Sequence, residues 1–179
     1  MNSVTATPLV TVVLATYNQQ DFVKNALESI LAQTYQNLEI IVCDNGSTDK
    51  TKEIIRSIVS KFQKIVFLDF KNNKNITIRH NYYINLANGE FVSILFGDDY
   101  YLPNKIEKQV EAFLNLDASW GVVYGPTLIE HKVNNKLAQD DGLQKSGYVL
   151  EALLNNWHNG GIMKCVVPLT RTECYKKYL

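Results

Sequence analysis

The run Leu9-Val10-Thr11-Val12-Val13-Leu14-Ala15, which leads into Thr16-Tyr17-Asn18, decides the fold class. It is short, rich in β-branched residues and almost continuously apolar, as is typical of a strand buried on both faces of a parallel sheet. Apolar residues then recur at spacings of three and four on one face of a predicted helix: Phe22, Val23, Ala26, Leu27, Ile30 and Leu31. The chain therefore begins with a strand, a loop and a helix.

Three more strand–helix units follow. Strands are predicted over residues 38–43, 65–70 and 91–96, and helices over residues 54–62, over 77–87 and after Pro103. Ser47 or Thr48 is expected to cap the second helix, with Asp49 near its positive end. Four consecutive units predict an α/β fold with a Rossmann-like, mostly parallel sheet flanked by helices.

The composition indicates one soluble domain. The chain has 179 residues, of which 46% are hydrophobic and 20% charged, with 18 basic and 18 acidic residues. A net charge of zero argues against a nucleic-acid-binding protein, and the chain has neither a long apolar run nor a signal-peptide pattern, so a cytoplasmic location is predicted. Cys43, Cys165 and Cys174 lack the paired spacing of metal or redox sites and are expected to be reduced, structural thiols.

Polar side chains follow three of the predicted strands. Thr16 and Tyr17 come after the first strand, Asp44 after the second, and Asp98 and Asp99 after the fourth. Right-handed crossovers bring the carboxyl ends of parallel strands to one edge of the sheet, where ligands bind in open α/β folds. We therefore expect these side chains to converge on one crevice.

The chemistry of this crevice favours a divalent cation. The glycine-rich fingerprints of dinucleotide and P-loop sites are absent, and two adjacent carboxylates repel phosphate unless a cation lies between them. Mg²⁺ or Mn²⁺ binds one or two carboxylates and completes its coordination with substrate phosphates. In isolation, the Asp98-Asp99 pair is more often a turn at the start of a helix.

The ordered motifs resemble the family 2 glycosyltransferases of GT-A fold. The first block is residues 10–18, the second residues 26–35 and the third residues 38–49. Asn81, the run Ala87-Asn88-Gly89-Glu90-Phe91-Val92, and Gly97-Asp98-Asp99 with Leu102-Pro103 continue the match in order. The resemblance covers about residues 9–115 and implies a glycosyltransferase that moves a sugar from a nucleotide-diphosphate-sugar donor to an acceptor hydroxyl, with an inverting mechanism expected.

The resemblance also implies roles for individual residues. Nucleotide-binding residues would be Ala15, Thr16, Tyr17, Asp44, Arg79 and Asp98, with Tyr17 stacking on a base, commonly uracil, and Asp44 accepting from its N–H. As a side chain facing the cleft, Asp44 is expected to add little to the core. Asp98 would contact the ribose or sugar and share the metal with Asp99. Phe96 stands where most members have the first aspartate of the motif, and Arg79 lies one residue before the family's arginine, a position that His80 takes here.

The second half of the chain is less regular. A strand over residues 121–124, a polar loop over 132–147, a helix near 148–154 and a strand near 162–167 are predicted. The loop is interpreted as a substrate lid or as a variable insertion. Residues 1–179 would form one GT-A domain, truncated at its C-terminus, with 9–115 as the donor-binding half and 116–179 as the start of the acceptor-binding half. No recognisable acidic block supplies a catalytic base, so the base is expected beyond Leu179.

The resemblance also implies partners for the protein, and two alternative functions remain open. The resemblance implies a nucleotide-sugar donor, commonly UDP-linked, a saccharide or lipid-linked acceptor in polysaccharide or glycolipid synthesis, and peripheral association with the inner face of a membrane. One rival is a donor-binding module without catalysis, which Phe96 and the missing base favour. The other is a sugar nucleotidyltransferase, which would need a basic loop after the first strand; residues 16–20 contain no basic residue. If the base did lie within the chain, Glu151, Glu173 and the Asp140-Asp141 pair would be the alternatives.

Overall fold

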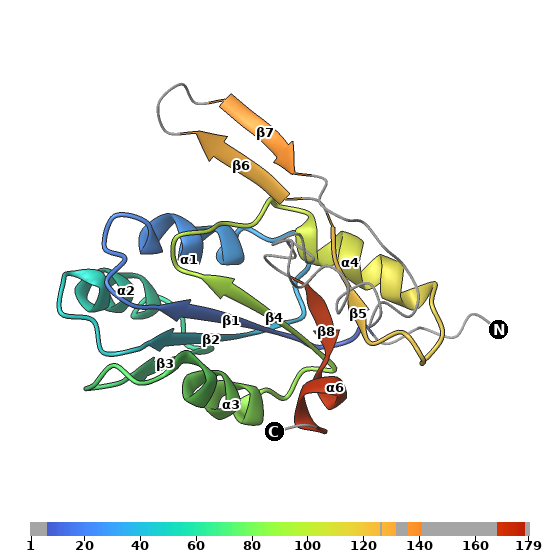
Figure 1. Ribbon diagram of the computed structural model, residues 1–179, viewed down its shortest axis with the longest axis horizontal. Coiled ribbons are helices and arrows are strands. Elements are labelled where there is room, and N and C mark those ends of the chain that lie inside the picture. The colour runs from blue at the N-terminus through green and yellow to red at the C-terminus, as the bar shows by residue number, and fades with distance from the viewer. Residues whose placement is uncertain (1–6, 126, 132–135, 141–167, 178–179) are drawn as a thin grey trace, which may run out of the picture.

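Strand β1 (Val10–Thr16) lies inside a six-stranded sheet, with every residue buried. The structure is a computed structural model, which describes residues 7–125, 127–131, 136–140 and 168–177. The strand order is β3-β2-β1-β4-β8-β5, and a separate hairpin pairs β6 with β7. The expected α/β fold is confirmed, and Figure 1 shows its layers.

The first four strands are parallel, as predicted. They are β1, β2 (Leu38–Asp44), β3 (Ile65–Asp69) and β4 (Phe91–Phe96), and β1 lies between β2 and β4. In their register Thr16 pairs with Asp44, and Ala15 pairs with both Cys43 and Phe96. This register brings the carboxyl ends of three strands level at one edge of the sheet.

Two layers of helices cover the sheet (Figure 1). Helices α1 (Val23–Leu31), α2 (Thr51–Val59) and α4 (Lys105–Leu114) pack on one face, and α3 (Ile76–Leu86) and α6 (Thr172–Lys176) pack on the other. Successive residues of β1 alternate between the two cores: Leu14 points to the first and Val13 to the second. A strand buried on both sides needs apolar residues at nearly every position, which explains its continuous run.

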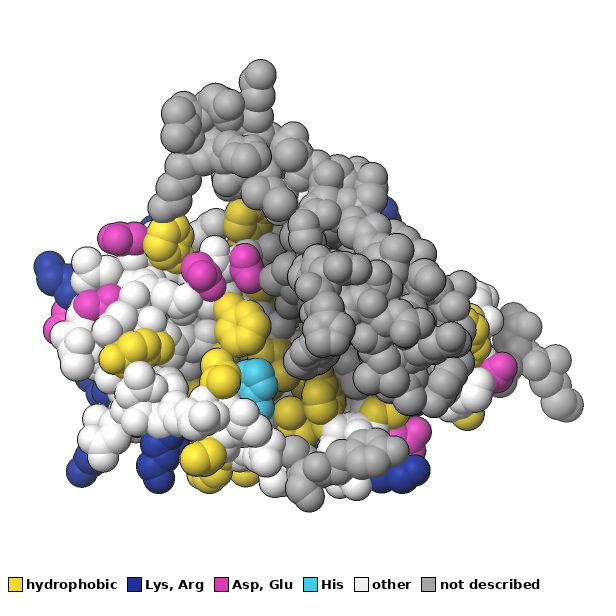
Figure 2. Space-filling view, in the orientation of Figure 1, with side chains coloured by type: hydrophobic (Ala, Val, Ile, Leu, Met, Phe, Trp, Pro, Cys, Tyr) yellow, Lys and Arg dark blue, Asp and Glu magenta, His cyan; other side chains and the backbone are white. Residues whose placement is uncertain are grey.

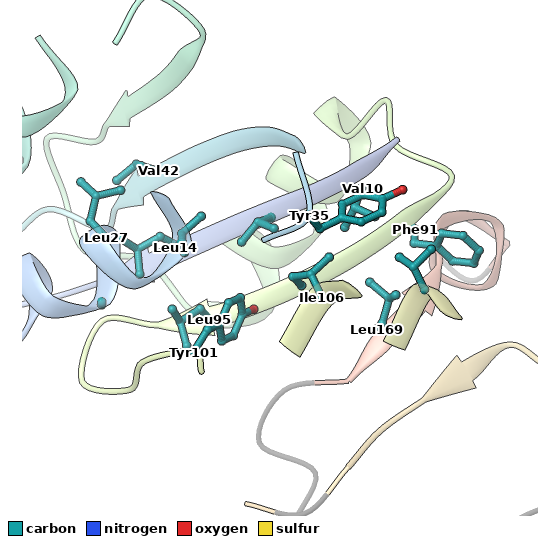
Figure 3. Packing of buried hydrophobic residues seen from close by; sticks show 14 of the residues in the cluster. Val10, Leu14, Leu27, Tyr35, Val42, Phe91, Leu95, Tyr101, Ile106 and Leu169 are labelled. Atoms are coloured by element: carbon teal, nitrogen blue, oxygen red, sulfur yellow. The ribbon is translucent and has the colours of Figure 1, made fainter. Parts of the chain in front are cut away.

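The larger core forms between the sheet and α1, α2 and α4. Figure 3 shows Leu14 of β1 beside Leu27 of α1, and Phe91, Leu95 and Ile106 further along the same layer. Phe91 also stacks on Phe113 of α4, with ring centroids 4.5 Å apart. These contacts hold the fourth strand–helix unit against the first, and so fix the relative positions of the strand ends.

The second half of the chain departs from the prediction in several places. Strand β5 (Val122–Val123) is shorter than expected, and β6 (Thr127–His131) pairs with β7 (Lys136–Asp140) where a polar loop was predicted, so the loop interpretation is wrong for residues 136–140. Residues 136–140 are mostly polar, so the sequence shows no apolar run for this strand; among the described residues, β7 pairs with β6 alone. The predicted helix at 148–154 and strand at 162–167 lie outside the described residues.

Strand β8 (Leu169–Arg171) was not predicted. It lies between β4 and β5 and pairs antiparallel with both of them. With only three residues it has no readable periodicity, and its partner β4 lies far away in the sequence, so local pattern gives no signal for it.

The predicted cap of α2 is also wrong. The residue before the helix is Lys50, with no side-chain hydrogen bond to the helix, whereas Asp49 Oδ1 accepts from Thr51 N at 3.0 Å. Ser47 does not cap because its hydroxyl bonds to Asp44 instead. Within the described part of the chain, no helix has the length and apolarity needed to cross a bilayer.

Candidate functional site

A cleft of about 130 Å³, open to solvent, lies at the carboxyl ends of β1 and β4, beside α3. Strand ends, the loop after β1 and one side of α3 supply its lining residues: Ala15, Thr16, Tyr17, Gln19, Cys43, Asn45, Ile76, Arg79, Tyr83 and Phe96. Five of these were predicted or singled out from the sequence, namely Ala15, Thr16, Tyr17, Arg79 and Phe96. Figure 2 shows acidic and hydrophobic side chains close together near the middle of the described surface.

The loop after β1 is held in place by the loop after β2. Asn18 N donates to Ser47 Oγ at 2.9 Å, and Thr48 N donates to Asn18 Oδ1 at 2.8 Å. Gln19 N donates to Thr51 Oγ1 at 2.8 Å. These bonds support the left-handed backbone of Asn18, at φ 51°, which is unusual for a residue other than glycine. The two loops are therefore one pre-formed unit.

Tyr17 projects from this unit into the cleft. Its side chain is 42% exposed, although aromatic rings at strand ends are usually packed. The backbone on its C-terminal side is fixed by the loop-to-loop hydrogen bonds of Asn18 and Gln19. An exposed ring on a rigid loop is suited to stacking on a flat ligand, because little conformational entropy is lost on binding.

Asp44 lies beneath the cleft and is completely buried. Its Oδ2 accepts from Gly46 N at 3.0 Å and Ser47 N at 2.8 Å, and its Oδ1 accepts from the Ser47 hydroxyl and, at 3.3 Å, from Thr16 Oγ1. Lys52 Nζ lies 3.6 Å from Oδ2. The expectation that Asp44 adds little to the core is wrong, because its carboxylate is buried and accepts four hydrogen bonds, three from its own turn and one from Thr16 of β1.

Gly46 makes that turn possible. Its φ is +84°, and a Cβ atom at this position would lie 2.5 Å from the carbonyl carbon of Asn72. A side chain is thus excluded both by the backbone conformation and by the loop after β3, which packs directly on the turn. Asn45 joins the same two segments, because its Nδ2 donates to Asn73 Oδ1 at 2.7 Å and to the Lys74 carbonyl at 2.8 Å.

Arg79 reaches the cleft from α3, and most of its hydrogen bonds join α3 to the loops after β2 and β3. Only 7% exposed, it donates from Nε to Asn45 Oδ1 at 2.7 Å and from Nη2 to the Asn72 carbonyl at 2.6 Å. Its guanidinium also lies 3.4 Å from the centre of the Phe70 ring. Its third nitrogen, Nη1, has no hydrogen-bond partner among the described residues and remains available to a ligand.

Asp98 and Asp99 stand outside the lining of the cleft, two and three positions after Phe96. Asp98 is exposed and Asp99 half-buried, and neither carboxylate has a hydrogen bond or ion pair within the described part of the chain. Burial and the charge of Asp98 both raise the pKa of Asp99 above its ordinary value. Gly97 lets the chain pass close to β1, because a Cβ there would lie 2.8 Å from Thr16 Cγ2.

Phe96 and His80 form an aromatic wall with Tyr83. The His80 ring stacks on Phe96 at 6.1 Å between centroids and lies 5.2 Å from the Tyr83 ring. Burial lowers the pKa of His80, and its Nε2 has no partner among the described residues. Phe96 thus packs on an aromatic side chain and lines the cleft at the same time.

Several lining residues were not predicted. Gln19 and Tyr83 each bring a buried side-chain oxygen with no described partner to the cleft, and Asn45 and Ile76 complete its wall. Gln19 and Asn45 each lie close behind a predicted strand end, so the rule that selected Tyr17 extends to them. Cys43 also contributes, but burial raises the pKa of its thiol to about 12, so it is a packing residue as expected.

Among the described residues at the strand ends, Asp98 and Asp99 are the candidate metal ligands. The described residues contain no group of three or more histidine, cysteine or acidic side chains that would enclose a metal ion. Two adjacent carboxylates with free oxygens fit a divalent cation that takes its other ligands from water and phosphate. They do not fit a structural zinc site, which needs four protein ligands.

Comparison with known proteins assigns the chain to a family. The family model described as Glycosyl transferase family 2 matches residues 11–162. An uncharacterized glycosyltransferase of Rickettsia typhi is 41% identical over 133 residues, which are 74% of this chain and 41% of that protein. The UDP-Glc:alpha-D-GlcNAc-diphosphoundecaprenol beta-1,3-glucosyltransferase WfaP of Escherichia coli is 39% identical over 104 residues, 57% of this chain and 40% of WfaP. The chain thus spans about two fifths of the length of these relatives.

Solved structures share the fold. The mannosyltransferase PcManGT of Pyrobaculum calidifontis, in complex with GDP-Man and Mn²⁺, superposes with a TM-score of 0.70 at 19% identity, covering 97% of this chain and 47% of that one. Residues 1–349 of S. aureus TarS, in complex with UDP, superpose with a TM-score of 0.69 at 20% identity, covering 94% and 48%. Both are GT-A glycosyltransferases, so the expected GT-A fold is confirmed.

Proposed function

The chain belongs to glycosyl transferase family 2, and on that premise we propose that its cleft binds the nucleotide of a nucleotide-diphosphate-sugar donor, whose sugar is transferred to an acceptor hydroxyl. The observation that carries the proposal is the pairing of an exposed aromatic ring, Tyr17, on a rigid loop with two unpartnered carboxylates, Asp98 and Asp99, at the neighbouring strand end. A ring and a cation-binding pair are suited to opposite ends of a nucleoside diphosphate.

The proposed nucleotide is UDP. The name of the Escherichia coli relative includes UDP-Glc, and TarS has been solved with UDP, whereas PcManGT carries GDP-Man. In the proposed complex Tyr17 stacks on the base and Arg79 Nη1 contacts the donor. Thr16 and Ala15 form the floor of the cleft beneath it.

For Asp44 we propose a contact that requires an exchange of partners. The weakest of its four hydrogen bonds is the one from Thr16 Oγ1, at 3.3 Å, and Thr16 itself lines the cleft. Rotation of the Thr16 hydroxyl frees one acceptor position on Oδ1 for an N–H of the base. The other three bonds keep the carboxylate in place during the exchange.

Mg²⁺ or Mn²⁺ would be held by Asp98 and Asp99. When bound, the ion neutralises the diphosphate and stabilises the negative charge that develops on it as the sugar leaves. Asp98 is also proposed to contact the ribose or sugar. Residues 9–115 then act as the donor-binding half, and residues 116–179 begin the acceptor-binding half.

The proposed acceptor is a saccharide or a lipid-linked saccharide in polysaccharide or glycolipid synthesis at the cytoplasmic face of a membrane, with inversion at the sugar. The support is the name of WfaP, which includes a diphosphoundecaprenol-linked sugar.

The direct test is calorimetric titration of the chain with UDP in Mn²⁺ and in excess chelator. We expect affinity at least about tenfold higher with the metal, because Asp98 and Asp99 repel bare diphosphate. GDP titrated in the same way serves as the matched control for the base. Equal UDP affinity with and without Mn²⁺ would refute the metal assignment, and stronger GDP binding would refute the choice of UDP.

A second function, donor binding without transfer, is favoured by Phe96, which replaces a carboxylate at the metal motif with an aromatic ring packed on His80. Release of UDP from a UDP-sugar, measured with and without a saccharide acceptor, distinguishes the two. Acceptor-dependent release supports the transferase, and tight UDP binding with no release supports the binding module.

A further inference from the structure

Helix α3 turns one face to the cleft and leaves an apolar face exposed. Arg79 and Tyr83 line the cleft, whereas Ile78, Tyr82 and Leu86, four residues apart, are 41–55% exposed. The only charged residue of the helix is Arg79, which is buried. A helix that faced only water would carry charged residues on its outer face, as α1, α2 and α4 do with Glu28, Glu53 and Glu111.

The exposed apolar face continues onto the edge of the sheet. Phe70, just after β3, contacts Tyr82 edge to face, with ring centroids 5.4 Å apart. Val66 lies two and four positions before Leu68 and Phe70, on the same side of β3, and is itself exposed. We name Val66, Phe70, Ile78, Tyr82 and Leu86 the α3 patch. Of the twelve large hydrophobic residues found exposed in the described structure, half come from residues 62–86.

Exposed lysines flank β3, the strand that contributes Val66 to the patch. Lys61 and Lys64 come before β3, and Lys71 and Lys74 follow it; all four are exposed, and no ion pair joins any of them to a described acidic residue. The one acidic residue between positions 61 and 86, Asp69, is paired with Lys52 and Arg56. A chain whose net charge is zero therefore concentrates unpaired positive charge at this edge. Figure 2 shows basic side chains beside hydrophobic ones along the lower left of the molecule.

We propose that the α3 patch docks on the surface of an anionic lipid bilayer, with its apolar side chains at the headgroup boundary and the lysines on lipid phosphates. Apolar residues flanked by lysines are the composition that binds such surfaces. A second copy of the chain fits poorly, because a symmetric contact through the same patch would bring like charges together. The proposal stands on the patch and its lysines and does not depend on the donor. Because α3 also lines the cleft, docking places the cleft beside the membrane.

The test is flotation of the protein with vesicles of phosphatidylcholine alone or with one quarter phosphatidylglycerol. We expect binding to the anionic vesicles only, with loss at high salt. Lys64→Gln and Lys71→Gln should each weaken it about fivefold, since a lysine near an anionic surface contributes about 1 kcal/mol. The double variant Ile78→Ser, Leu86→Ser should weaken it more than about tenfold.

Matched controls come from the opposite layer of helices. Lys24→Gln on α1 removes an exposed lysine, and Leu114→Ser on α4 removes an apolar side chain that is 59% exposed; both should leave vesicle binding unchanged. Circular dichroism checks that each variant is folded. UDP affinity of the soluble form, measured in parallel, is expected to be unchanged in every patch variant, which separates this proposal from the donor site.

Three results would overturn the proposal. The first is equal binding to neutral and anionic vesicles, and the second is an equal loss of binding in the control variants. The third is a concentration-dependent dimer, seen by analytical ultracentrifugation, that Ile78→Ser with Leu86→Ser abolishes in a protein that does not bind vesicles. In that case the patch is an interface between copies of the chain.

Discussion

The acidic ends of β2 and β4 look alike in sequence but differ in the folded protein. Asp44 is buried and accepts four hydrogen bonds, whereas Asp98 and Asp99 accept none from the described residues. The difference lies in the residues that follow. After Asp44, Gly46 takes a positive φ and turns two backbone amides and the Ser47 hydroxyl back onto the carboxylate. No such turn follows Asp98.

The contrast shows that an aspartate at a strand end can have either of two roles. A carboxylate whose acceptor positions are filled by its own turn builds the floor of a site, and one with free oxygens is available to a cation. The position of an acidic residue at a strand end therefore indicates where a site lies, while the donors in the next three residues indicate which task the residue has.

The largest effect should come from removing the buried carboxylate. Asp44→Ala leaves two backbone amides and two hydroxyls without their acceptor, and Lys52 keeps only Asp69 and the Phe70 carbonyl; we expect a loss of about 3–5 kcal/mol in the free energy of unfolding, measured with urea. Asp98→Ala, the matched change at the other strand end, should alter it by less than about 0.5 kcal/mol. Equal stabilities of the two variants would show that the contrast in burial has no energetic meaning.

A smaller effect, on binding rather than stability, is expected at the exposed pair. Asp99→Asn should reduce Mn²⁺-dependent UDP affinity about thirtyfold, or ~2 kcal/mol, because it removes a charged ligand from the proposed cation. UDP affinity in chelator should not fall, and the melting temperature should stay within a few degrees. Asp117→Asn, an exposed carboxylate after α4, is the control. A loss of UDP affinity that is the same with and without Mn²⁺ would contradict the assignment.

The smallest effect concerns pH. Burial and the charge of Asp98 raise the pKa of Asp99, so Asp99 takes up a proton at a pH where an ordinary aspartate is still ionised. Only the ionised form binds a cation, so Mn²⁺-dependent UDP affinity should fall as the pH is lowered through this raised pKa. Asp98→Asn removes one of the two causes and should move the midpoint to lower pH. A midpoint that moves upward, or not at all, would mean that the two carboxylates are not coupled.

The parts of the fold that repeat locally could be predicted from the sequence. The continuous apolar run of β1 and the three- and four-residue spacing in α1 both reflect burial against near neighbours in the chain. Because parallel strand ends meet at one edge, Thr16 and Tyr17 could be assigned to one site without coordinates, whereas Arg79, on a helix, was predicted only from the family resemblance. The family motifs then supplied the chemistry that periodicity alone does not.

The parts that depend on distant partners could not be predicted. Burial of Asp44 depends on the left-handed turn at Gly46, and Arg79 is buried because Asn45 and Asn72 bind it from two other loops. Apolar and polar residues are mixed around helix α3, so its sequence does not show which side faces solvent. The burial of these residues depends on contacts between segments far apart in the sequence. A window of ten or fifteen residues contains no information about such contacts.

The position of β8 also affects how the protein folds during synthesis. It fills the place between β4 and β5, so β4 keeps one edge unpaired until residues 169–171 have left the ribosome. At about 5–20 residues per second, translation of residues 97–168 takes roughly 4–14 s, during which an apolar strand has an open hydrogen-bonding edge. The four N-terminal units can assemble in that time, but the sheet closes only when the late strand arrives, which makes the nascent chain prone to edge-to-edge aggregation over this interval.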